Sequence, residues 1–431
     1  MRPPVPSGSV HESRLDVGAL PKPKAGLIEA AVDGETVVFD AEADLLHHLD
    51  GTASAVWSQL DGTVTIRNLA RRLAASYGAS EETVHRDVVD LVGVLWERGL
   101  LRGSEPAIAT PKRTAAPHVD SGPLSMTLGE RVLDDLALPE AAHRTHGHRA
   151  LEHAFMVATN DLGFRDYLDH VLIDVSSPNV GQPDRYDLLD LGTQAHDNRF
   201  LVLFNGTLVT ATNRADRALW VLLWHINAEV IQRSTPRWPL VHAAAAVTEG
   251  VAVLLPGPAE SGKTTTVAGL VRAGFAYLTD EAVAIDGETL VAQPYPKALS
   301  IDQGSWPILS DLRPTHDERL AGRWQVPVRQ IHPDAVSGPA PIRFVISPEY
   351  HVGATTRLEP VSRGEMLTCL ADSTFQFQDN AGRNLEVLAN VVANADCYRL
   401  TVSDLDQAVK LIADVVSSEQ LDVTEGQPPV S

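Results

Sequence analysis

The sequence predicts a multi-domain fold: an N-terminal winged-helix-like α+β domain, a linker, and a C-terminal α/β domain built on a phosphate-binding loop. A length of 431 residues is enough for two or three domains. A strand signal and three helical segments fill residues 26–102, and a proline-rich stretch follows at 103–123. An apolar run at 251–255 then leads directly into a glycine-rich loop and a helix. Two domains of different architecture are therefore expected on either side of a linker.

The charge balance excludes several kinds of partner. Acidic residues number 56 and basic residues 35, a formal net charge of −21. Binding to nucleic acid or to anionic lipid depends on positive charge, so we expect no nucleic-acid and no membrane partner. Two cysteines, Cys369 and Cys397, are too few for a disulfide scaffold or a four-cysteine zinc site. Because the N-terminus lacks the apolar segment of a signal peptide, we expect a cytoplasmic protein.

Residues 26–102 are predicted to form one compact unit after a loosely attached arm at 1–25. The strand Glu35–Phe39 follows the turn signal Asp33-Gly34. Leu45, Leu46 and Leu49 are interpreted as leading into the first of three helices. These helices are expected near residues 52–60, 66–77 and 82–98, each with an apolar face.

After the linker at 103–123, the second domain is expected at 124–417, followed by a flexible tail at 418–431. Its nucleotide core is expected at about 240–415. The first half contains predicted strands at 170–175 and 200–204, the hairpin signal Asn205-Gly206, and a buried helix at 215–232.

The most informative segment is a complete G-x-x-x-x-G-K-[ST] motif. It consists of Gly257-Pro258-Ala259-Glu260-Ser261-Gly262-Lys263-Thr264, with Thr265 next. The glycines let successive N–H groups face one phosphate, and the following helix directs its positive end at the same anion. We expect Lys263 to reach the β- and γ-phosphates and Thr264 to bind Mg²⁺. Residues 257–265 are therefore the predicted nucleotide site.

An acidic pair follows the next predicted strand, residues 275–279. Asp280 lies only 16 residues after Thr264, so one helix and one short strand separate them. A carboxylate at a strand end beside a phosphate loop is the usual second Mg²⁺ anchor, and it can also orient an incoming hydroxyl. Asp280 and Glu281 are therefore candidate metal ligands together with Thr264.

Other chemistry-bearing residues give weaker signals. Lys297 follows the acidic pair and is interpreted as an exposed lysine. Neither cysteine has the neighbours of a catalytic nucleophile. A histidine cluster lacks metal-site spacing and is interpreted as a solvent-facing run beside a helix: His143, His146, His148 and His153.

Three motifs in residues 240–285 resemble those of HPr kinase/phosphorylase-like kinases: His242-Ala243-Ala244-Ala245, the phosphate loop, and Leu278-Thr279-Asp280-Glu281. The resemblance implies ATP and Mg²⁺ as cofactors and phosphoryl transfer to a hydroxyl. It also implies that Asp280 or Glu281 helps to deprotonate the hydroxyl. Between these two we favour Asp280 as the base and Glu281 as a metal ligand, and the assignment stays open. His242 is expected near the γ-phosphate, with a core histidine as the alternative. The acidic pair is Asp-Glu where the bacterial enzymes have Asp-Asp. No clear counterpart of their phosphorylase loop is present, so kinase activity is the expected function.

Residues 26–102 resemble PqqD-like domains, which recognise leader peptides of ribosomally made, post-translationally modified peptides. The resemblance is carried by Asp33-Gly34-Glu35-Thr36-Val37-Val38, Leu49-Asp50-Gly51-Thr52, Leu60-Asp61-Gly62 and Leu95-Trp96-Glu97-Arg98-Gly99. It implies that an extended leader adds to a sheet edge, with the third helix as a wall. We expect this groove between residues 35–40 and the helix at 82–98.

Together these features predict an ATP-dependent kinase that phosphorylates a serine hydroxyl of a precursor peptide, as in lasso-peptide tailoring. The leader would be held by residues 26–102. A small-molecule or sugar kinase is one alternative, and a non-catalytic, nucleotide-gated peptide-binding module is another. Homo-oligomerisation is left open.

Overall fold

Backbone contacts divide the chain into two units that do not follow the order of the sequence. Unit 1 consists of Met1–Thr114, Ser362–Asp372 and Phe377–Ala389, and unit 2 of Ala115–Val361, Ser373–Gln376 and Asn390–Ser431. The computed structural model describes residues 21–102, 138–192, 198–314 and 323–425. Residues 1–20 of the expected arm, the expected linker at 103–123, the start of the second domain at 124 and residues 426–431 lie outside this range. The expected start of the flexible tail at 418 is wrong, because residues 418–425 continue helix α11 (Leu405–Glu425).

Unit 1 contains an antiparallel sheet of three strands, β1 (Leu27–Val32), β2 (Glu35–Asp40) and β3 (Leu45–Leu49), in the order β1-β2-β3. Helices α2 (Gly51–Trp57), α3 (Ile66–Tyr77) and α4 (Glu81–Glu97) follow. Asp50 and Thr65 cap the first two helices by accepting bonds from Ala53 N–H and Asn68 N–H. The predicted strand and three helices are confirmed.

Two local predictions for unit 1 are wrong. Residues 45–49 form strand β3 and do not lead into a helix, because their backbone pairs with β2 from Leu45↔Asp40 to Leu49↔Thr36. The sequence Leu-Leu-His-His-Leu does not alternate apolar and polar residues, so periodicity does not identify this segment as a strand. Residues 22–24 are not part of a loose arm: Pro23 bridges Leu101, and the Lys24 ammonium lies 3.0 Å from the Asp40 carboxylate.

Both faces of the unit 1 sheet are covered. Val38 and Leu49 pack into the core formed with α2–α4. The next residue, Phe39, points to the opposite face, as alternation in a strand requires, and its ring packs edge-on against Phe377 at 5.0 Å. Phe377 comes from the second half of the sequence, which is why residues 362–372 and 377–389 join unit 1. The expected boundaries placed them in the second domain.

Helix α9 (Arg363–Asp372) is anchored on this second face through its N-terminus. Glu35 Oε2 accepts a hydrogen bond from Gly364 N–H at 3.0 Å and lies 3.0 Å from His48 Nε2. The Arg363 guanidinium pairs with Asp33 at 2.7 Å. A carboxylate at a helix N-terminus satisfies an unpaired N–H group and interacts favourably with the helix dipole. Glu35, on the sheet of unit 1, therefore caps the N-terminus of α9, a helix that is distant in sequence.

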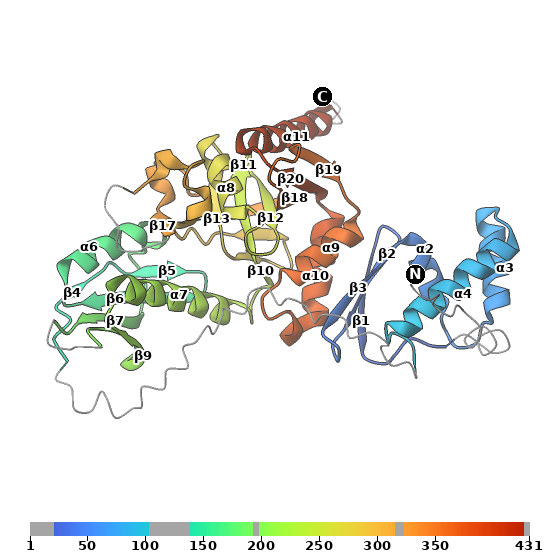
Figure 1. Ribbon diagram of the computed structural model, residues 1–431, viewed down its shortest axis with the longest axis horizontal. Helices are drawn as coiled ribbons and strands as arrows, with labels where there is room; N and C mark the ends of the chain where they lie inside the picture. Colours follow the sequence, from blue (N-terminus) through green and yellow to red (C-terminus); the bar gives the residue numbers. More distant parts are fainter. Residues whose placement is uncertain (1–20, 103–137, 193–197, 315–322, 426–431) are drawn as a thin grey trace, which may run out of the picture. The chain divides into compact units, whose positions relative to one another are not determined.

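The larger sheet of unit 2 has nine strands in the order β10-β14-β15-β18-β12-β11-β13, with β20 beside β18 and β19 beside β20 (Figure 1). Strands β12, β18 and β20 are parallel neighbours. The bounds are β10 (Leu240–Val241), β11 (Ala243–Thr248), β12 (Val251–Pro256), β13 (Ala276–Thr279), β14 (Val283–Ile285), β15 (Val291–Gln293), β18 (Ala340–Tyr350), β19 (Arg357–Pro360) and β20 (Asp396–Val402).

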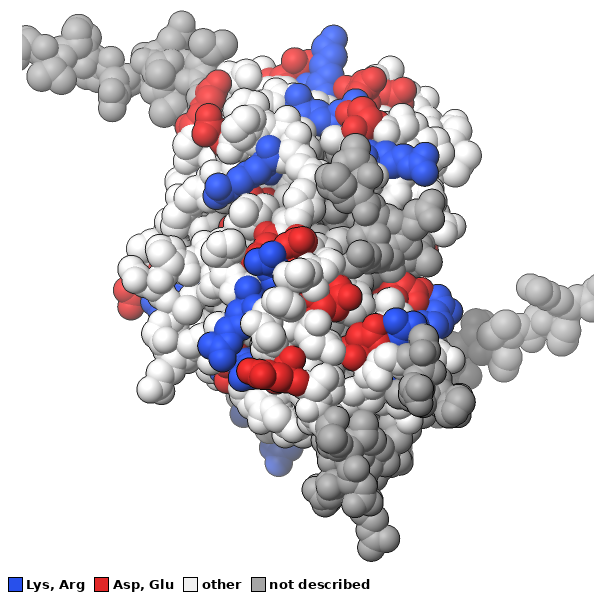
Figure 2. Space-filling view, turned by 90° about the vertical axis from the view of Figure 1, so that its left-hand side faces the viewer, with Lys and Arg blue, Asp and Glu red and all other residues white. Residues whose placement is uncertain are grey.

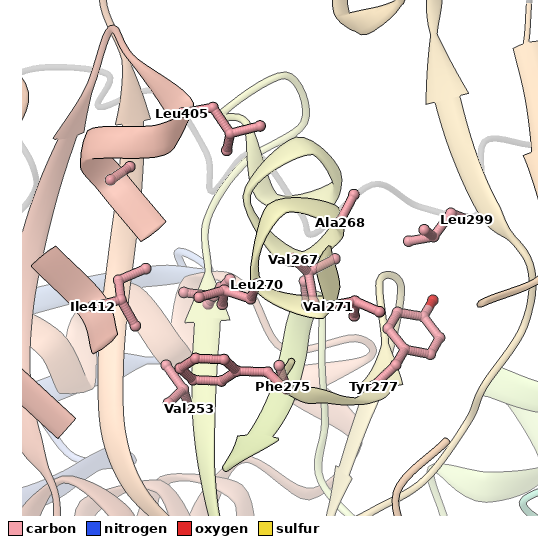
Figure 3. Close-up of a cluster of buried hydrophobic side chains, with 14 of the residues drawn as sticks. Val253, Val267, Ala268, Leu270, Val271, Phe275, Tyr277, Leu299, Leu405 and Ile412 are labelled. Atoms are coloured by element: carbon pink, nitrogen blue, oxygen red, sulfur yellow. The ribbon is translucent and has the colours of Figure 1, made fainter. Parts of the chain in front are cut away.

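Helix α8 (Lys263–Arg272) lies against this sheet beside β11 and α11 (Leu405–Glu425) (Figure 1). Its apolar side chains form the centre of a buried cluster that extends to strands β16 (Leu299–Asp302) and β17 (Arg323–Val326). Figure 3 shows Leu270 beside Phe275, on the side of Val253 and Ile412, and Val267 and Val271 on the side of Tyr277 and Leu299. Because α8 is embedded in this way, the loop before it is held in place by the core.

The smaller sheet of unit 2 has six strands, in the order β4-β6-β7-β8-β9 with β5 beside β6. Helices α6 (Leu162–Val171) and α7 (Ala215–Ser234) accompany it. The hairpin at Asn205-Gly206 and the helix expected at 215–232 are confirmed. The bounds are β4 (His143–Arg144), β5 (His148–Ala150), β6 (His153–Thr159), β7 (Asp184–Asp190), β8 (Phe200–Phe204) and β9 (Thr207–Thr212).

The strand predicted at 170–175 is wrong, because these residues form the end of α6 and a short 3-10 helix at Ile173–Val175. Asp161 starts α6 by accepting a hydrogen bond from Phe164 N–H. Phe164, Leu168 and Val171 then form one buried helical face. A short apolar run fits a buried helix end as well as a strand, and the N-cap decides between them.

The histidine run is not solvent-facing as a whole. His148 and His153 lie on strands β5 and β6 with fully buried side chains, and neither is beside a helix start. Burial lowers the pKa of each to about 4. Within the parts of the chain that the structure describes, no three His, Cys, Asp or Glu side chains are grouped as a metal site. His148 and His153 are therefore neutral core residues at neutral pH.

Surface charges on the smaller sheet are paired locally. Arg185 with Asp187 and Arg199 with Asp190 form ion pairs there, and Arg214 with Asp216 forms one at the start of the neighbouring helix α7. Figure 2 shows positive and negative side chains interspersed over this side of the molecule. Among the described residues, no helix is both long and apolar enough to cross a bilayer.

Buried His148 and His153 make stability depend on pH. Their pKa values are near 4 in the folded protein against 6.5 in the unfolded chain, so the unfolded chain binds more protons between these values. Stability should be highest above pH 6.5 and should fall as the pH decreases towards 4. Denaturant titrations at several pH values will measure this. The double variant His148→Gln/His153→Gln should show a shallower dependence of stability on pH than the wild type. An unchanged dependence in the double variant would contradict the interpretation.

Gly364→Ala should destabilise unit 1. A Cβ at this position would lie 2.2 Å from Glu35 Oε2 and 2.6 Å from His48 Nε2, so the capping contacts must move. The expected loss is about 1–3 kcal/mol in the free energy of unfolding. Gly382, in α10 (Ala381–Ala393), is the matched control because a Cβ there meets nothing within 4 Å. Gly382→Ala should be neutral or stabilising by up to about 1 kcal/mol, and equal losses for both variants would argue against the cap.

Candidate active site

The glycine-rich loop at residues 257–262 connects the end of β12 to the start of α8, as the sequence predicts. Gly262 has φ +95°, a conformation that a side chain disfavours. Gly257 leaves space for Ser261, because a Cβ at position 257 would lie only 3.0 Å from Ser261 Oγ. Ser261 Oγ is itself buried and has no hydrogen-bond partner among the described residues. A closely wrapped loop with an unsatisfied buried hydroxyl fits an anion such as phosphate.

The Lys263 ammonium folds back onto the loop. Its Nζ donates to Gly257 O at 2.8 Å and to Pro258 O at 2.6 Å, and the side chain is buried. Thr264, which follows it, is partly buried, while the Thr265 hydroxyl lies 2.6 Å from Ser305 Oγ. The one cation of the loop is therefore held against the backbone that would surround a phosphate.

Strand register brings the predicted site residues to one edge of the larger sheet. Strand β11 pairs with β12 on one side, Ala243 opposite Pro256, and with β13 on the other, Ala245 opposite Thr279. Neighbouring strands lie about 4.8 Å apart. His242 directly precedes β11, Gly257 directly follows β12 and Asp280 directly follows β13. The structure thus places the three motifs close together, although they come from three strands.

Asp280 is buried and fully engaged. Its side chain is 1% exposed, and Oδ1 accepts from the Tyr277 hydroxyl at 2.9 Å and lies 2.9 Å from Lys297 Nζ. Oδ2 accepts from Ser300 N–H at 3.2 Å. Burial and the Asp280 carboxylate raise the pKa of Tyr277, so its hydroxyl stays protonated and can donate. Asp280 is therefore a fixed acceptor with little access to an incoming substrate.

Glu281 is the accessible carboxylate of the acidic pair. Its side chain is 27% exposed, with Oε2 3.6 Å from Lys297 Nζ and Oε1 3.9 Å from His242 Nδ1. The same His242 nitrogen lies 3.1 Å from the Glu281 backbone oxygen. Burial and the nearby Lys263 ammonium lower the pKa of His242, so its ring is neutral at neutral pH and Nδ1 can donate to that oxygen.

Sequence reasoning missed Lys297 and Tyr277. Lys297 was interpreted as an exposed lysine, but its side chain is 15% exposed and contacts both carboxylates. Burial acts to lower the pKa of Lys297, but Asp280 and Glu281 outweigh burial and the pKa is raised. The only signal in the sequence was the position of Lys297 shortly after the acidic pair. Nothing in the sequence indicated that the Tyr277 hydroxyl would reach Asp280.

Of the three expected Mg²⁺ ligands, Thr264 and Glu281 fit the ion better than Asp280 does. Mg²⁺ commonly takes one or two carboxylates together with phosphate oxygens and water. Both Asp280 oxygens already have protein partners, whereas Glu281 reaches solvent. A hydroxyl and one accessible carboxylate beside a phosphate loop therefore fit the ion only when phosphate supplies further oxygens.

Asp280→Asn should destabilise unit 2 strongly, because Lys297 would remain buried without its principal counter-charge. Removing one partner of a buried ion pair costs about 3–5 kcal/mol. Glu281→Gln is the control: its carboxylate is more exposed and more distant, so a loss below about 1 kcal/mol is expected. Chemical denaturation of both variants measures the difference. Equal losses would show that the Asp280–Lys297 pair is not a structural contact, and the double variant Asp280→Asn/Lys297→Met should recover part of the loss.

Comparison with known proteins assigns the N-terminal domain. Residues 35–101 match the family model described as coenzyme PQQ synthesis protein D (PqqD). No curated protein matches the chain.

Two solved structures are similar to parts of the chain. One is TbiB1 in complex with the TbiA(beta) leader peptide, with 26% identity, a TM-score of 0.19, and coverage of 20% of this chain and 98% of that one. The other is the Hpr(Ser) kinase/phosphatase from Coxiella burnetii, with 16% identity, a TM-score of 0.24, and coverage of 43% of this chain and 98% of that one. The chain thus contains a PqqD domain at residues 35–101, and its structural neighbours include a leader-peptide complex and an HPr kinase/phosphatase.

Proposed function

We propose that this protein is an ATP-dependent kinase that phosphorylates a hydroxyl, in the first instance serine, of a ribosomally made precursor peptide. The observation that carries the proposal is the convergence of the phosphate loop, His242 and Glu281 at one sheet edge, in a chain that also contains a PqqD domain. A phosphate site alone would fit many kinases. A PqqD domain on the same chain favours a peptide substrate over a small molecule or sugar.

The chain's own groups suggest a division of roles. Lys263 and the loop N–H groups would bind the β- and γ-phosphates, and Thr264 and Glu281 would hold Mg²⁺, which neutralises charge on the phosphates when bound. The exposure of Glu281 makes it the better candidate to accept the proton of the incoming hydroxyl as well. Asp280 would act through Lys297 as a positioning residue. This reverses the preference drawn from the sequence, which gave the base role to Asp280.

Neutral His242 would orient Glu281. Its ring contacts the Glu281 backbone and side chain, and it packs against Phe375 with ring centroids 5.6 Å apart. A histidine with a lowered pKa adds no positive charge beside Lys263. His242 is therefore proposed to fix the accessible carboxylate in place and not to bind the nucleotide as a cation.

The leader peptide is proposed to add to β3. The groove expected beside residues 35–40 is excluded, because β2 is the central strand and both its edges are paired. Among the described residues β3 pairs only with β2, so its other edge offers backbone groups for strand addition. His47 of β3 points towards the helices, is buried, and its Nε2 has no hydrogen-bond partner there. A bound peptide would supply a polar partner.

The test is to incubate the full chain with ATP, Mg²⁺ and the precursor peptide encoded beside its gene, and to weigh the peptide. One added phosphoryl group is expected. Lys263→Ala should abolish the transfer. Glu281→Gln should slow it by about 10²–10⁴-fold, with a loss of stability below about 1 kcal/mol. A peptide that lacks its leader should be phosphorylated with a higher KM.

Two controls separate the alternatives. Phosphorylation of free serine or a sugar, with the precursor left unmodified, would favour a small-molecule kinase. Nucleotide and peptide binding without any transfer would favour a non-catalytic module. Wild-type-like turnover by Lys263→Ala would defeat the assignment of the phosphate loop.

A further inference from the structure

An exposed tyrosine stands beside the phosphate loop at the end of the neighbouring strand. Strands β12 and β18 are parallel, with Leu254 opposite Val345, so their carboxyl ends meet at the same sheet edge (Figure 1). Pro348 O is 3.7 Å from the position of a Cβ on Gly257, and Tyr350 Cβ is 3.9 Å from that on Gly262. The last residues of β18 therefore run alongside both glycines of the loop.

Tyr350 and Val352 are large apolar side chains that are exposed and are not part of the buried core. The Tyr350 side chain is 49% exposed and Val352 is 85% exposed. Most large apolar side chains of unit 2 are buried, so two such residues at one strand end, next to a phosphate loop, call for a functional explanation.

The turn that follows Tyr350 is held in a fixed conformation. His351 N–H donates to Val402 O at 2.9 Å, and Gly353 N–H donates to Ser403 Oγ at 3.1 Å. Thr356 Oγ1 accepts from Ser403 N–H and Asp404 N–H. These bonds tie the turn to the end of β20. An exposed side chain on an anchored backbone loses little conformational freedom on binding a ligand, which favours a preorganised contact surface.

We infer that Tyr350 is a platform for the nucleobase of the nucleoside triphosphate whose phosphates the loop holds. The inference rests on the proposed kinase function and adds the base-contacting residue to it. Every base has a π-face, and stacking on an aromatic side chain suits a ring that emerges next to the phosphate site. Val352 extends the same surface with aliphatic contact.

The experiment separates base contact from phosphate contact. Binding of ATP and of inorganic tripolyphosphate, each with Mg²⁺, is measured by calorimetry on the full chain. Tyr350→Ala should weaken ATP binding by about 5- to 100-fold and leave tripolyphosphate binding unchanged. Tyr350→Phe should bind ATP like the wild type, because the ring is kept. Tyr77→Ala, at a tyrosine of α3 that is 70% exposed, is the control for loss of an exposed ring.

The failures of this inference and of the kinase proposal are distinguishable. If the wild type binds both ligands, Lys263→Ala binds neither, and Tyr350→Ala binds ATP normally, only the base platform is overturned. Equal weakening of ATP and tripolyphosphate by Tyr350→Ala would also overturn it, because Tyr350 would then support the loop itself. If the wild type binds neither ligand, the nucleotide site and the platform both fail.

Discussion

The position of β12 inside its sheet is the constraint on which the candidate active site depends. This strand lies between parallel β18 and antiparallel β11, so both of its edges are paired. All of its side chains except that of Val251 are buried. At the carboxyl end of β12 the chain must therefore leave the sheet, and it does so through the loop that leads into α8. Other strands of the sheet end or begin at the same edge. His242 lies just before β11, Asp280 just after β13, and Tyr350 at the end of β18.

The two adjacent carboxylates differ in burial and in their hydrogen-bond partners. Asp280 has three protein donors and almost no exposure, whereas Glu281, one residue later, reaches solvent. A strand end turns successive side chains in different directions, so neighbours in sequence can have different environments. The Lys297 ammonium lies 2.9 Å from Asp280 and 3.6 Å from Glu281, so its positive charge reduces the cost of placing two carboxylates in a partly buried site.

The PqqD domain is more deeply integrated into the chain than its sequence match indicates. One face of its sheet packs on its own helices, and the other packs on Phe377 and α9. Glu35 caps α9 through Gly364, so a residue at the beginning of the family match stabilises a helix from the second half of the chain. Between α9 and Phe377 the chain passes through Ser373–Gln376, where Ser373 O accepts from His242 N–H. Any expression of residues 26–102 alone would leave Phe39 without this cover.

Local patterns in the sequence determined several of the helices, strands and turns. The G-x-x-x-x-G-K-T motif after an apolar run predicted the strand, turn and helix at 251–272. The Asn205-Gly206 dipeptide predicted a hairpin, which β8 and β9 form. These predictions succeeded because capping, turn geometry and glycine conformations involve residues close in sequence.

Only the tertiary structure decided what depends on contacts between distant residues. Periodicity could not reveal that β3 is a strand, since pairing with β2 overrides its sequence pattern. The burial of Lys297, the hydroxyl of Tyr277 on Asp280, and the place of α9 on the N-terminal sheet all join segments that are separated along the chain. Composition and motif spacing show which groups are present. The burial of these groups and their contact partners determine their charge and their access to substrate. Both depend on contacts that form only when distant segments pack together.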